Sequence, residues 1–193
     1  MADAIGYFKS RAPTYMALLM QDFGFDELDA AAIMGNFGHE SGGLTIYHEV
    51  GLPADKGGVS WPQFTGSRRR GFEKYCAQNK YDPHTDEAAY KYVFVELKGT
   101  EKAAVAKTKA AVGLDAKVRA FEQSYERAGI KNYPSRLRWA ELALSSFRAS
   151  DDDVIDTQPT LSDFSISDLV EELTGRPGVF QVWIGYEEDT TAD

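Results

Sequence analysis

Helical periodicity runs through most of this 193-residue chain and breaks in one place, residues 44–66. On both sides of that segment apolar residues recur every three or four positions, as they do on the buried face of a helix. Within the segment, repeated glycine and proline favour turns. They occur at Gly51, Pro53, Gly57, Gly58, Pro62 and Gly66. We therefore predict a mainly α-helical bundle with a small β-hairpin lobe.

The helical stretches carry start and stop signals. Asp26 and Thr85 occupy N-cap positions, and Gly24 and Gly99 follow the last periodic residues of two stretches. Pro13 is assigned to the first turn of the first helix, where proline is well tolerated. The predicted helices cover roughly residues 13–24, 26–40, 67–80, 85–98, 100–129 with a break at Gly113, and 134–148.

The net charge of −9 is unevenly distributed along the chain. Residues 1–149 carry 20 Lys and Arg against 18 Asp and Glu, whereas residues 150–193 carry one Arg against 12 acids. The body is therefore close to neutral and does not repel an anionic polymer. It is not basic enough for sustained binding of duplex nucleic acid, so we expect no nucleic-acid partner.

The acidic end differs from the body in pattern as well as in charge. We predict one domain over residues 1–149, an acidic linker over 150–160 and a small helix–strand module over 161–193. One helix and one strand cannot bury their own apolar faces. We therefore expect this module to dock on the body, on a second copy or on another protein.

The sequence shows no targeting or redox feature. The beginning of the chain lacks the basic region and long apolar run of a secretory signal, and its apolar runs are too short for membrane insertion. The single cysteine, Cys76, excludes an internal disulfide and a cysteine-based zinc cluster. Its helical spacing favours a packing role.

Glu40 lies at the end of a predicted helix, immediately before Ser-Gly-Gly. The carbonyl end of a helix disfavours a carboxylate, and the apolar neighbours Ile33 and Phe37 act in the same direction, so we expect Glu40 to favour its protonated form. A protonated glutamic acid is what general-acid catalysis requires. Asn36, one turn earlier, could orient the acid or a sugar hydroxyl. The alternative is a surface acid at a frayed helix end.

The segment that follows combines aromatic and amide side chains, as many ligand clefts do. Tyr47, Trp61 and Phe64 could stack on sugar faces, and Gln63 and Thr65 could hydrogen-bond to hydroxyls or acetamides. Alternatively, Trp61 and Phe64 are core residues of a hairpin.

Several of these stretches together resemble the phage tail lysozyme family, within the wider lysozyme-like superfamily that includes lytic transglycosylases. They are AAIMGNFGHESGGL, GGVSWPQFTGSRRRGFEKY, YVFVELKGT and YERAG, and the resemblance spans roughly residues 15–148. It implies an α+β lysozyme-like fold around a glycan cleft, and cleavage of the peptidoglycan glycan strand. By the motif match Glu40 becomes the catalytic acid, Gln63 and Thr65 line the cleft, and Tyr125 is a further contact.

A second carboxylate decides the mechanism, because inverting and retaining glycosidases place it at different distances from the acid. The candidates are Glu49 and Asp55, and we favour Glu49 as the partner of Glu40 in hydrolysis of the MurNAc–GlcNAc β-1,4 bond. If neither faces the cleft, the substrate's own hydroxyl could close the reaction, as in a lytic transglycosylase.

Other classes of function have weaker support. The pairs His39-Glu40 and His48-Glu49 lack the spacing of a zinc site, because residue 43 is glycine, and no metal or cofactor is expected. Arg68, Arg69 and Arg70 are interpreted as a solvated face, and Glu96, Glu126 and Arg136 as ion pairs behind the cleft.

The remaining alternative is a non-catalytic glycan-binding tail component. The resemblance places the chain in a phage virion tail or in the host cytoplasm, acting on the cell wall. A phage particle protein is then one candidate partner for the module over 161–193.

Overall fold

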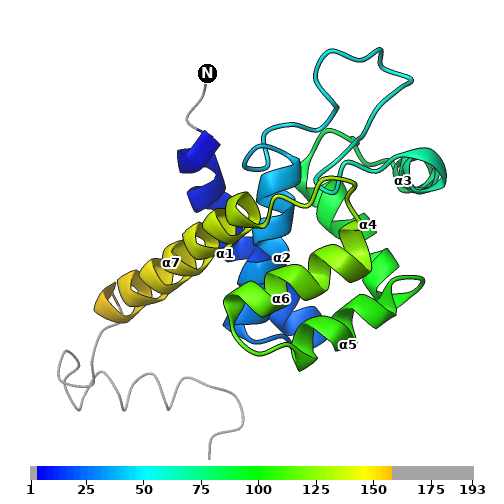
Figure 1. Ribbon diagram of the computed structural model, residues 1–193. Helices are drawn as coiled ribbons and strands as arrows, with labels where there is room; N and C mark the ends of the chain where they lie inside the picture. Colours follow the sequence, from blue (N-terminus) through cyan, green and yellow to red (C-terminus); the bar gives the residue numbers. More distant parts are fainter. Residues whose placement is uncertain (1–3, 158–193) are drawn as a thin grey trace, which may run out of the picture. The chain divides into compact units, whose positions relative to one another are not determined.

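Residues 4–157 are the part of the chain that this computed structural model describes, with side chains up to residue 150, and they contain eight helical segments. Seven are α-helices, which are labelled in Figure 1, and one is a short π-helical turn. They are α1 (Ala4–Phe23), α2 (Glu27–Glu40), α3 (Gly66–Asn79), α4 (Asp86–Lys98), α5 (Lys102–Ala110), α6 (Leu114–Phe121), η1 (Glu122–Glu126) and α7 (Tyr133–Thr157). The mainly helical prediction is confirmed. The predicted module over 161–193 lies outside the described residues.

Helix α2 is the centre of the body, because every residue from Asp29 to Gly38 is buried. It packs against α1 and α6. Its N-terminus is closed by a capping box, in which the Asp26 side chain accepts from the N–H of Asp29 and the Asp29 side chain accepts from that of Asp26. The predicted cap at Asp26 is thus confirmed, and it fixes where this central helix begins.

Two glycines in α2 allow α7 and α1 to approach its backbone. A Cβ added at Gly35 would lie 2.5 Å from the Cβ of Ala140 and 2.6 Å from its backbone nitrogen. A Cβ added at Gly38 would lie 2.8 Å from the ring of Phe8. Phe8 in turn meets Trp139 edge-to-face at 4.8 Å. The C-terminal half of α2 is therefore held between α1 and α7.

Residues 44–65, which we call the loop lobe, contain no strand. Two isolated antiparallel bridges, His48 with Val59 and Val59 with Phe64, are the pairings found there. The predicted β-hairpin is therefore not formed as a regular element. Left-handed backbone at Ser60 (φ 64°) and Gln63 (φ 49°) turns the chain too often for a ladder to extend.

Buried polar groups hold the loop lobe to the helices. The carboxylate of Asp86, in the first turn of α4, accepts hydrogen bonds from Trp61 Nε1 at 3.1 Å and from the hydroxyl of Tyr47. It also accepts from Arg11 Nε at 2.9 Å. On the other side of the lobe, Arg69 donates to the carbonyls of Gly57 and Ala54.

Several predicted boundaries change. Helix α1 begins at Ala4, so Pro13 lies inside it rather than in its first turn. Helix α7 continues to Thr157, so residues 150–157 of the predicted linker are its last residues. The Thr85 cap is confirmed by its hydrogen bond from the N–H of Ala88, and Gly99 is the C-cap of α4.

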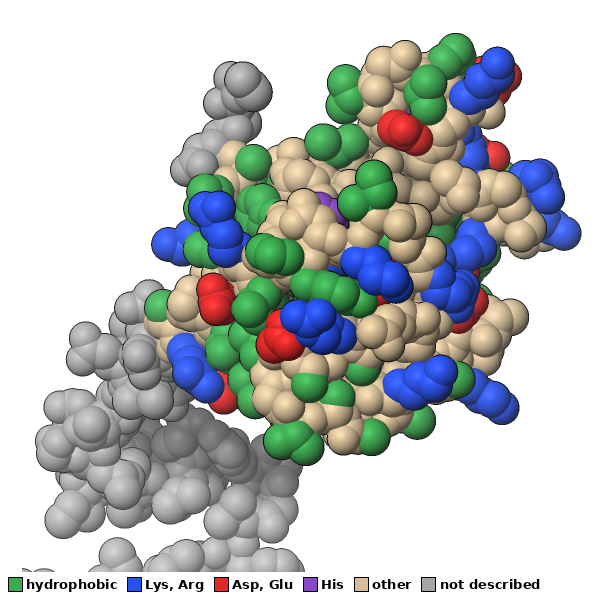
Figure 2. Space-filling view, in the orientation of Figure 1, with side chains coloured by type: hydrophobic (Ala, Val, Ile, Leu, Met, Phe, Trp, Pro, Cys, Tyr) green, Lys and Arg blue, Asp and Glu red, His purple; other side chains and the backbone are tan. Residues whose placement is uncertain are grey.

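The surface of the body is mixed in character. Figure 2 shows Lys and Arg side chains spread over one face rather than gathered into a single patch. Among the described residues, no helix is long and apolar enough to cross a membrane. Cys76 is buried, and burial raises the pKa of its thiol to about 11, so it remains a neutral packing residue at physiological pH.

Replacing Gly35 with alanine should destabilise the protein by about 1–3 kcal/mol, because the new methyl group would meet the backbone of Ala140. Urea unfolding measures the effect. Gly129→Ala is the matched control, since a Cβ there meets nothing within 4 Å. A Gly35→Ala variant as stable as the control would show that α2 and α7 are not in close contact.

Candidate active site

Glu40 is the last residue of α2, and the chain reverses immediately after it. Ser41 closes the helix, because both its N–H (3.0 Å) and its hydroxyl (2.6 Å) donate to the carbonyl of Phe37. Gly42 and Gly43 follow with left-handed φ of 56° and 75°. A Cβ at Gly43 would lie 2.8 Å from the ring of Trp139, so glycine is also required there by space. The turn leaves Glu40 at the rim of the helix bundle.

Glu40 opens into a groove of about 440 Å³ formed by three segments of the chain. These are the end of α2, the last turn of the loop lobe, and the chain from the end of η1 onward. The residues that line it are His39, Glu40, Pro62, Gln63, Thr65, Glu126, Arg127, Ala128, Gly129 and Ile130. We refer to this feature as the groove.

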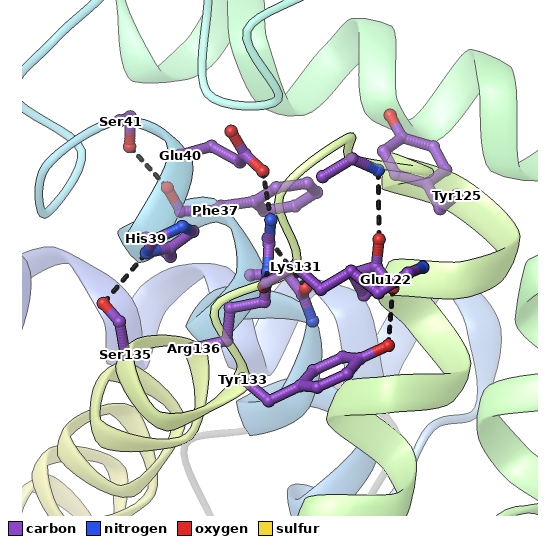
Figure 3. Close-up of polar contacts among 12 residues, drawn as sticks. Phe37, His39, Glu40, Ser41, Glu122, Tyr125, Lys131, Tyr133, Ser135 and Arg136 are labelled. Carbon is purple, nitrogen blue, oxygen red and sulfur yellow. Dashed lines mark hydrogen bonds and ion pairs between the residues drawn. The ribbon is translucent and has the colours of Figure 1, made fainter.

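The carboxylate of Glu40 is ion-paired with Arg136 of α7 (Figure 3). Nη2 of Arg136 lies 2.5 Å from Oε1 of Glu40, and the arginine side chain is fully buried whereas that of Glu40 is 20% exposed. Arg136 also donates to Oδ1 of Asn36 at 3.0 Å and to the carbonyl of Lys131 at 2.6 Å. The guanidinium is therefore fixed from three sides and positions the Glu40 carboxylate.

Asn36 acts behind this ion pair and is not exposed in the groove. It is fully buried, and its amide nitrogen donates to the carbonyls of Ala32 (2.9 Å) and Val118 (3.2 Å). These bonds fix the amide so that its oxygen faces Arg136. Asn36 is thus near Glu40, as predicted, but the two side chains are connected through Arg136, which donates to both.

Glu126 places a second carboxyl in the groove, at the end of η1. Its Oε1 is enclosed and has no hydrogen-bond partner. Burial, and then the negative charge of Glu40, raise the pKa of Glu126 well above its ordinary value. The groove therefore contains two carboxyl groups in different surroundings, one paired with an arginine and one without a partner.

A network beneath η1 fixes the position of Glu126. Arg68 forms a bidentate ion pair with Glu96, at 2.7 and 3.0 Å, and the hydroxyl of Tyr125 donates to the same carboxylate at 2.7 Å. Arg68 also lies between the rings of Phe64 and Tyr125, at 4.8 and 4.5 Å from their centroids. Burial lowers and the Glu96 hydrogen bonds raise the pKa of Arg68, and the net effect is upward, so the arginine stays charged.

Glu122 fastens the chain that forms the far wall of the groove. This fully buried carboxylate accepts from the N–H of Ala128 at 3.0 Å, from Lys131 at 3.0 Å and from the hydroxyl of Tyr133 at 2.9 Å (Figure 3). Burial alone would raise the pKa of Glu122, but the hydrogen bonds from Lys131 and Tyr133 outweigh it and lower the pKa. Residues 127–132 are thereby closed into a fixed loop.

His39 lines the groove next to Glu40 but faces α7. Its Nδ1 lies 2.9 Å from the hydroxyl of Ser135. Burial, followed by the positive charge of Arg136, lowers the pKa of His39, so the ring is neutral at physiological pH.

The predicted substrate residues fall into two groups. Gln63 and Thr65 line the groove together with Glu40. Trp61, Phe64 and Tyr125 are buried at 0–1% exposure and belong to the core, as the hairpin-core alternative anticipated for the first two. Tyr47 is bound to Asp86 and lines a separate hollow of about 160 Å³.

Neither predicted second carboxylate lines the groove. Glu49 is exposed, and its Oε2 accepts from the N–H of Gly58 at 2.9 Å within the loop lobe. Asp55 lines another hollow, of about 360 Å³, which shares Thr65 with the groove. Their positions outside the groove could not be predicted from their sequence separation from Glu40, because the lobe is an irregular loop.

For Arg136 and Glu126, the structure differs from the prediction of ion pairs behind the cleft. Glu96 and Arg136 do form ion pairs, as predicted, but Arg136 pairs with Glu40 itself. Glu126 lies in the groove wall instead of behind it. In the arginine run, Arg70 is exposed whereas Arg68 and Arg69 are engaged with Glu96 and the loop lobe, which corrects the prediction of a solvated face.

Comparison with known proteins gives one finding. The family model described as phage tail lysozyme matches residues 10–147. Neither a curated protein nor a solved structure matches the chain significantly.

Replacing Glu122 with glutamine should destabilise the protein by about 1–3 kcal/mol at neutral pH, because it removes hydrogen bonds to a charged group. The folded-state pKa of Glu122 lies below its unfolded value of 4.5, so its contribution is present above pH 4.5 and is lost as the pH falls through the folded-state value. The gap between the wild type and Glu122→Gln should therefore narrow below pH 4.5. Urea unfolding at several pH values measures it, and a gap independent of pH would contradict the assignment.

Proposed function

The chain belongs to the phage tail lysozyme family, and on that basis we propose that it cleaves the glycan strand of bacterial peptidoglycan at the MurNAc–GlcNAc β-1,4 bond. Membership supports a lysozyme-like, peptidoglycan-degrading activity and fits a protein that acts on the cell wall, in a virion or otherwise. The observation that carries the proposal for this chain is the position of Glu40, at a helix end, within the groove, and fixed by Arg136.

Cleavage of a glycosidic bond requires a proton for the leaving oxygen and a negative charge or base near the anomeric carbon. We propose that Glu40 supplies one of these two functions. The helix end and Phe37 were the basis for predicting an acid from the sequence, whereas the structure pairs the Glu40 carboxylate with the guanidinium of Arg136 at 2.5 Å. Which function Glu40 has depends on the second carboxyl group.

Gln63 and Thr65 are proposed as the glycan contacts that the loop lobe contributes to the groove. The amide nitrogen of Gln63 donates to the carbonyls of Ile46 (3.2 Å) and Ser60 (2.9 Å). The donors of the amide are thus committed to the loop lobe, and its oxygen is the atom that can accept from a sugar hydroxyl. Thr65 is exposed and offers its hydroxyl as both donor and acceptor.

The buried aromatic residues do not enter this proposal as stacking platforms. Trp61 and Phe64 have at most 1% of their surface accessible, so a sugar ring cannot reach their faces without unfolding the lobe. Their contribution is to hold the lobe in place. A groove with few exposed aromatic rings relies on polar contacts and on the shape of its walls to hold a sugar chain.

Glu40→Gln should abolish clearing of purified cell walls in a zymogram, because an amide supplies neither the proton nor the charge. Glu141→Gln, which changes an exposed acid on α7, is the matched control and should clear like the wild type. Clearing by Glu40→Gln equal to that of the control would remove Glu40 from the mechanism. Absence of clearing by the wild type would favour a glycan-binding protein.

The released sugars distinguish hydrolysis from transglycosylation, and we propose hydrolysis. Mass spectrometry of digested peptidoglycan should then show ordinary reducing ends, because water adds to the anomeric carbon. Exclusively 1,6-anhydromuramyl ends would instead identify a lytic transglycosylase that uses the same Glu40.

A further inference from the structure

Glu126 differs from the other acids enclosed in the body. Each of the four buried acids among the described residues has a cation within 3.0 Å. These pairs are Asp29 with Lys117, Asp86 with Arg11, Glu96 with Arg68, and Glu122 with Lys131. Glu126 is partly buried and forms no ion pair within this part of the chain, and its enclosed Oε1 accepts no hydrogen bond. Enclosing a carboxyl oxygen without a partner disfavours the charged form, so these surroundings favour the neutral carboxyl of Glu126, which carries a proton.

The cations near Glu126 are engaged elsewhere. Arg127, the next residue, has a left-handed backbone (φ 53°) and forms a bidentate pair with Glu101 at 2.8 and 3.1 Å. Arg68 is committed to Glu96, and Arg136 to Glu40. Although both arginines act to lower the pKa of Glu126, burial and the charge of Glu40 exceed their effect, and Glu96 adds to the upward shift. The remaining titratable neighbour in the groove, His39, is neutral.

The two carboxyl groups of the groove thus lie in opposite surroundings. Glu40 has an arginine at 2.5 Å, and Glu126 has an enclosed oxygen with no partner. Two neighbouring carboxyls whose surroundings favour opposite protonation states supply one acid and one base at the same pH. This is what hydrolysis of a glycoside requires.

We propose that Glu126 is the proton donor of this site and that Glu40 is its carboxylate partner, an inference that rests on the proposed function. It assigns the acid function to a residue other than the one the helix end suggests. It also replaces Glu49 and Asp55 as the second carboxyl group.

In the proposed step, Glu126 transfers its proton to the glycosidic oxygen, and the bond from that oxygen to the anomeric carbon breaks. The electron pair stays with the leaving oxygen, which becomes a hydroxyl. The carboxylate of Glu40 stabilises the positive charge that develops on the sugar ring. A water molecule then adds its hydroxyl to the anomeric carbon and returns its proton to the carboxyl pair. The pair ends with the single proton with which it began.

The position of Glu126 supports this function because its backbone is fixed from beneath. Tyr125, the residue before it, is fully buried, hydrogen-bonded to Glu96 and stacked on Phe121 at 4.7 Å. The π-helical turn that both residues belong to ends at Glu126, so its side chain lies at the groove. Such turns are frequent at functional sites.

The leaving group of the substrate tests the assignment. A proton donor matters for a sugar leaving group and hardly at all for dinitrophenolate, which departs without a proton. Glu126→Gln should therefore lose about 10²–10⁴-fold in rate on peptidoglycan while keeping most of its rate on a dinitrophenyl glycoside of a wall oligosaccharide. Glu40→Gln should lose both activities, and Glu141→Gln should keep both.

A pH profile gives an independent readout. On peptidoglycan the wild-type rate should fall at alkaline pH as Glu126 loses its proton. Glu126→Gln on the dinitrophenyl substrate should lack that alkaline fall. Because glutamine resembles the neutral acid in shape, this variant should keep the wild-type melting temperature, which separates catalysis from folding.

Three results would overturn the inference while leaving the proposed function intact. Glu126→Gln could retain full activity on peptidoglycan, or lose activity equally on both substrates, as a merely positioning residue would. Alternatively, Glu40→Gln could be the variant rescued by the dinitrophenyl leaving group. A wild type that cleaves no peptidoglycan would instead reject the proposed function itself, and this inference with it.

Discussion

The buried guanidinium of Arg136 connects the elements on which the groove depends. It joins α7 to the last turn of α2 through Glu40 and Asn36, and to the preceding loop through the carbonyl of Lys131. A charge with no solvent exposure needs a paired and hydrogen-bonded environment, so the loss of any of these partners would leave the guanidinium less well compensated. The same residue thus couples the stability of the bundle to the placement of the Glu40 carboxyl.

The loop lobe shows how the wall of a groove can be built without a sheet. A hairpin would satisfy its backbone groups by a ladder, but residues 44–65 have two isolated bridges. Asp86 and Arg69 take over part of that role, one accepting from the side chains of the lobe and the other donating to its carbonyls. This arrangement explains why Tyr47 and Trp61 face inward, since each supplies a donor that the buried Asp86 requires.

Local signals predicted much of the helical framework. The caps at Asp26 and Thr85 act through hydrogen bonds spanning three residues, so sequence alone reveals them. The start of α1 was placed too late because proline is compatible with either a first turn or, at a cost, an interior position, and packing chooses between them. The lobe was given a hairpin because its repeated glycine and proline favour turns, whereas the left-handed backbone at Ser60 and Gln63 is not encoded by residue type.

The position of Glu40 in the groove was predictable, but which charged side chains pair with it and with its neighbours was not. A helix end acts over one turn and is visible in the sequence, whereas Arg136, which pairs with the Glu40 carboxylate, comes from 96 residues away. The same holds for Glu126, whose surroundings depend on which carboxylates engage Arg68 and Arg127. A protonation state is the outcome of competition for cations across the whole fold. A helix end can therefore indicate that one carboxyl reaches a groove, whereas the three-dimensional fold decides which other carboxyl joins it and which of the two keeps a proton.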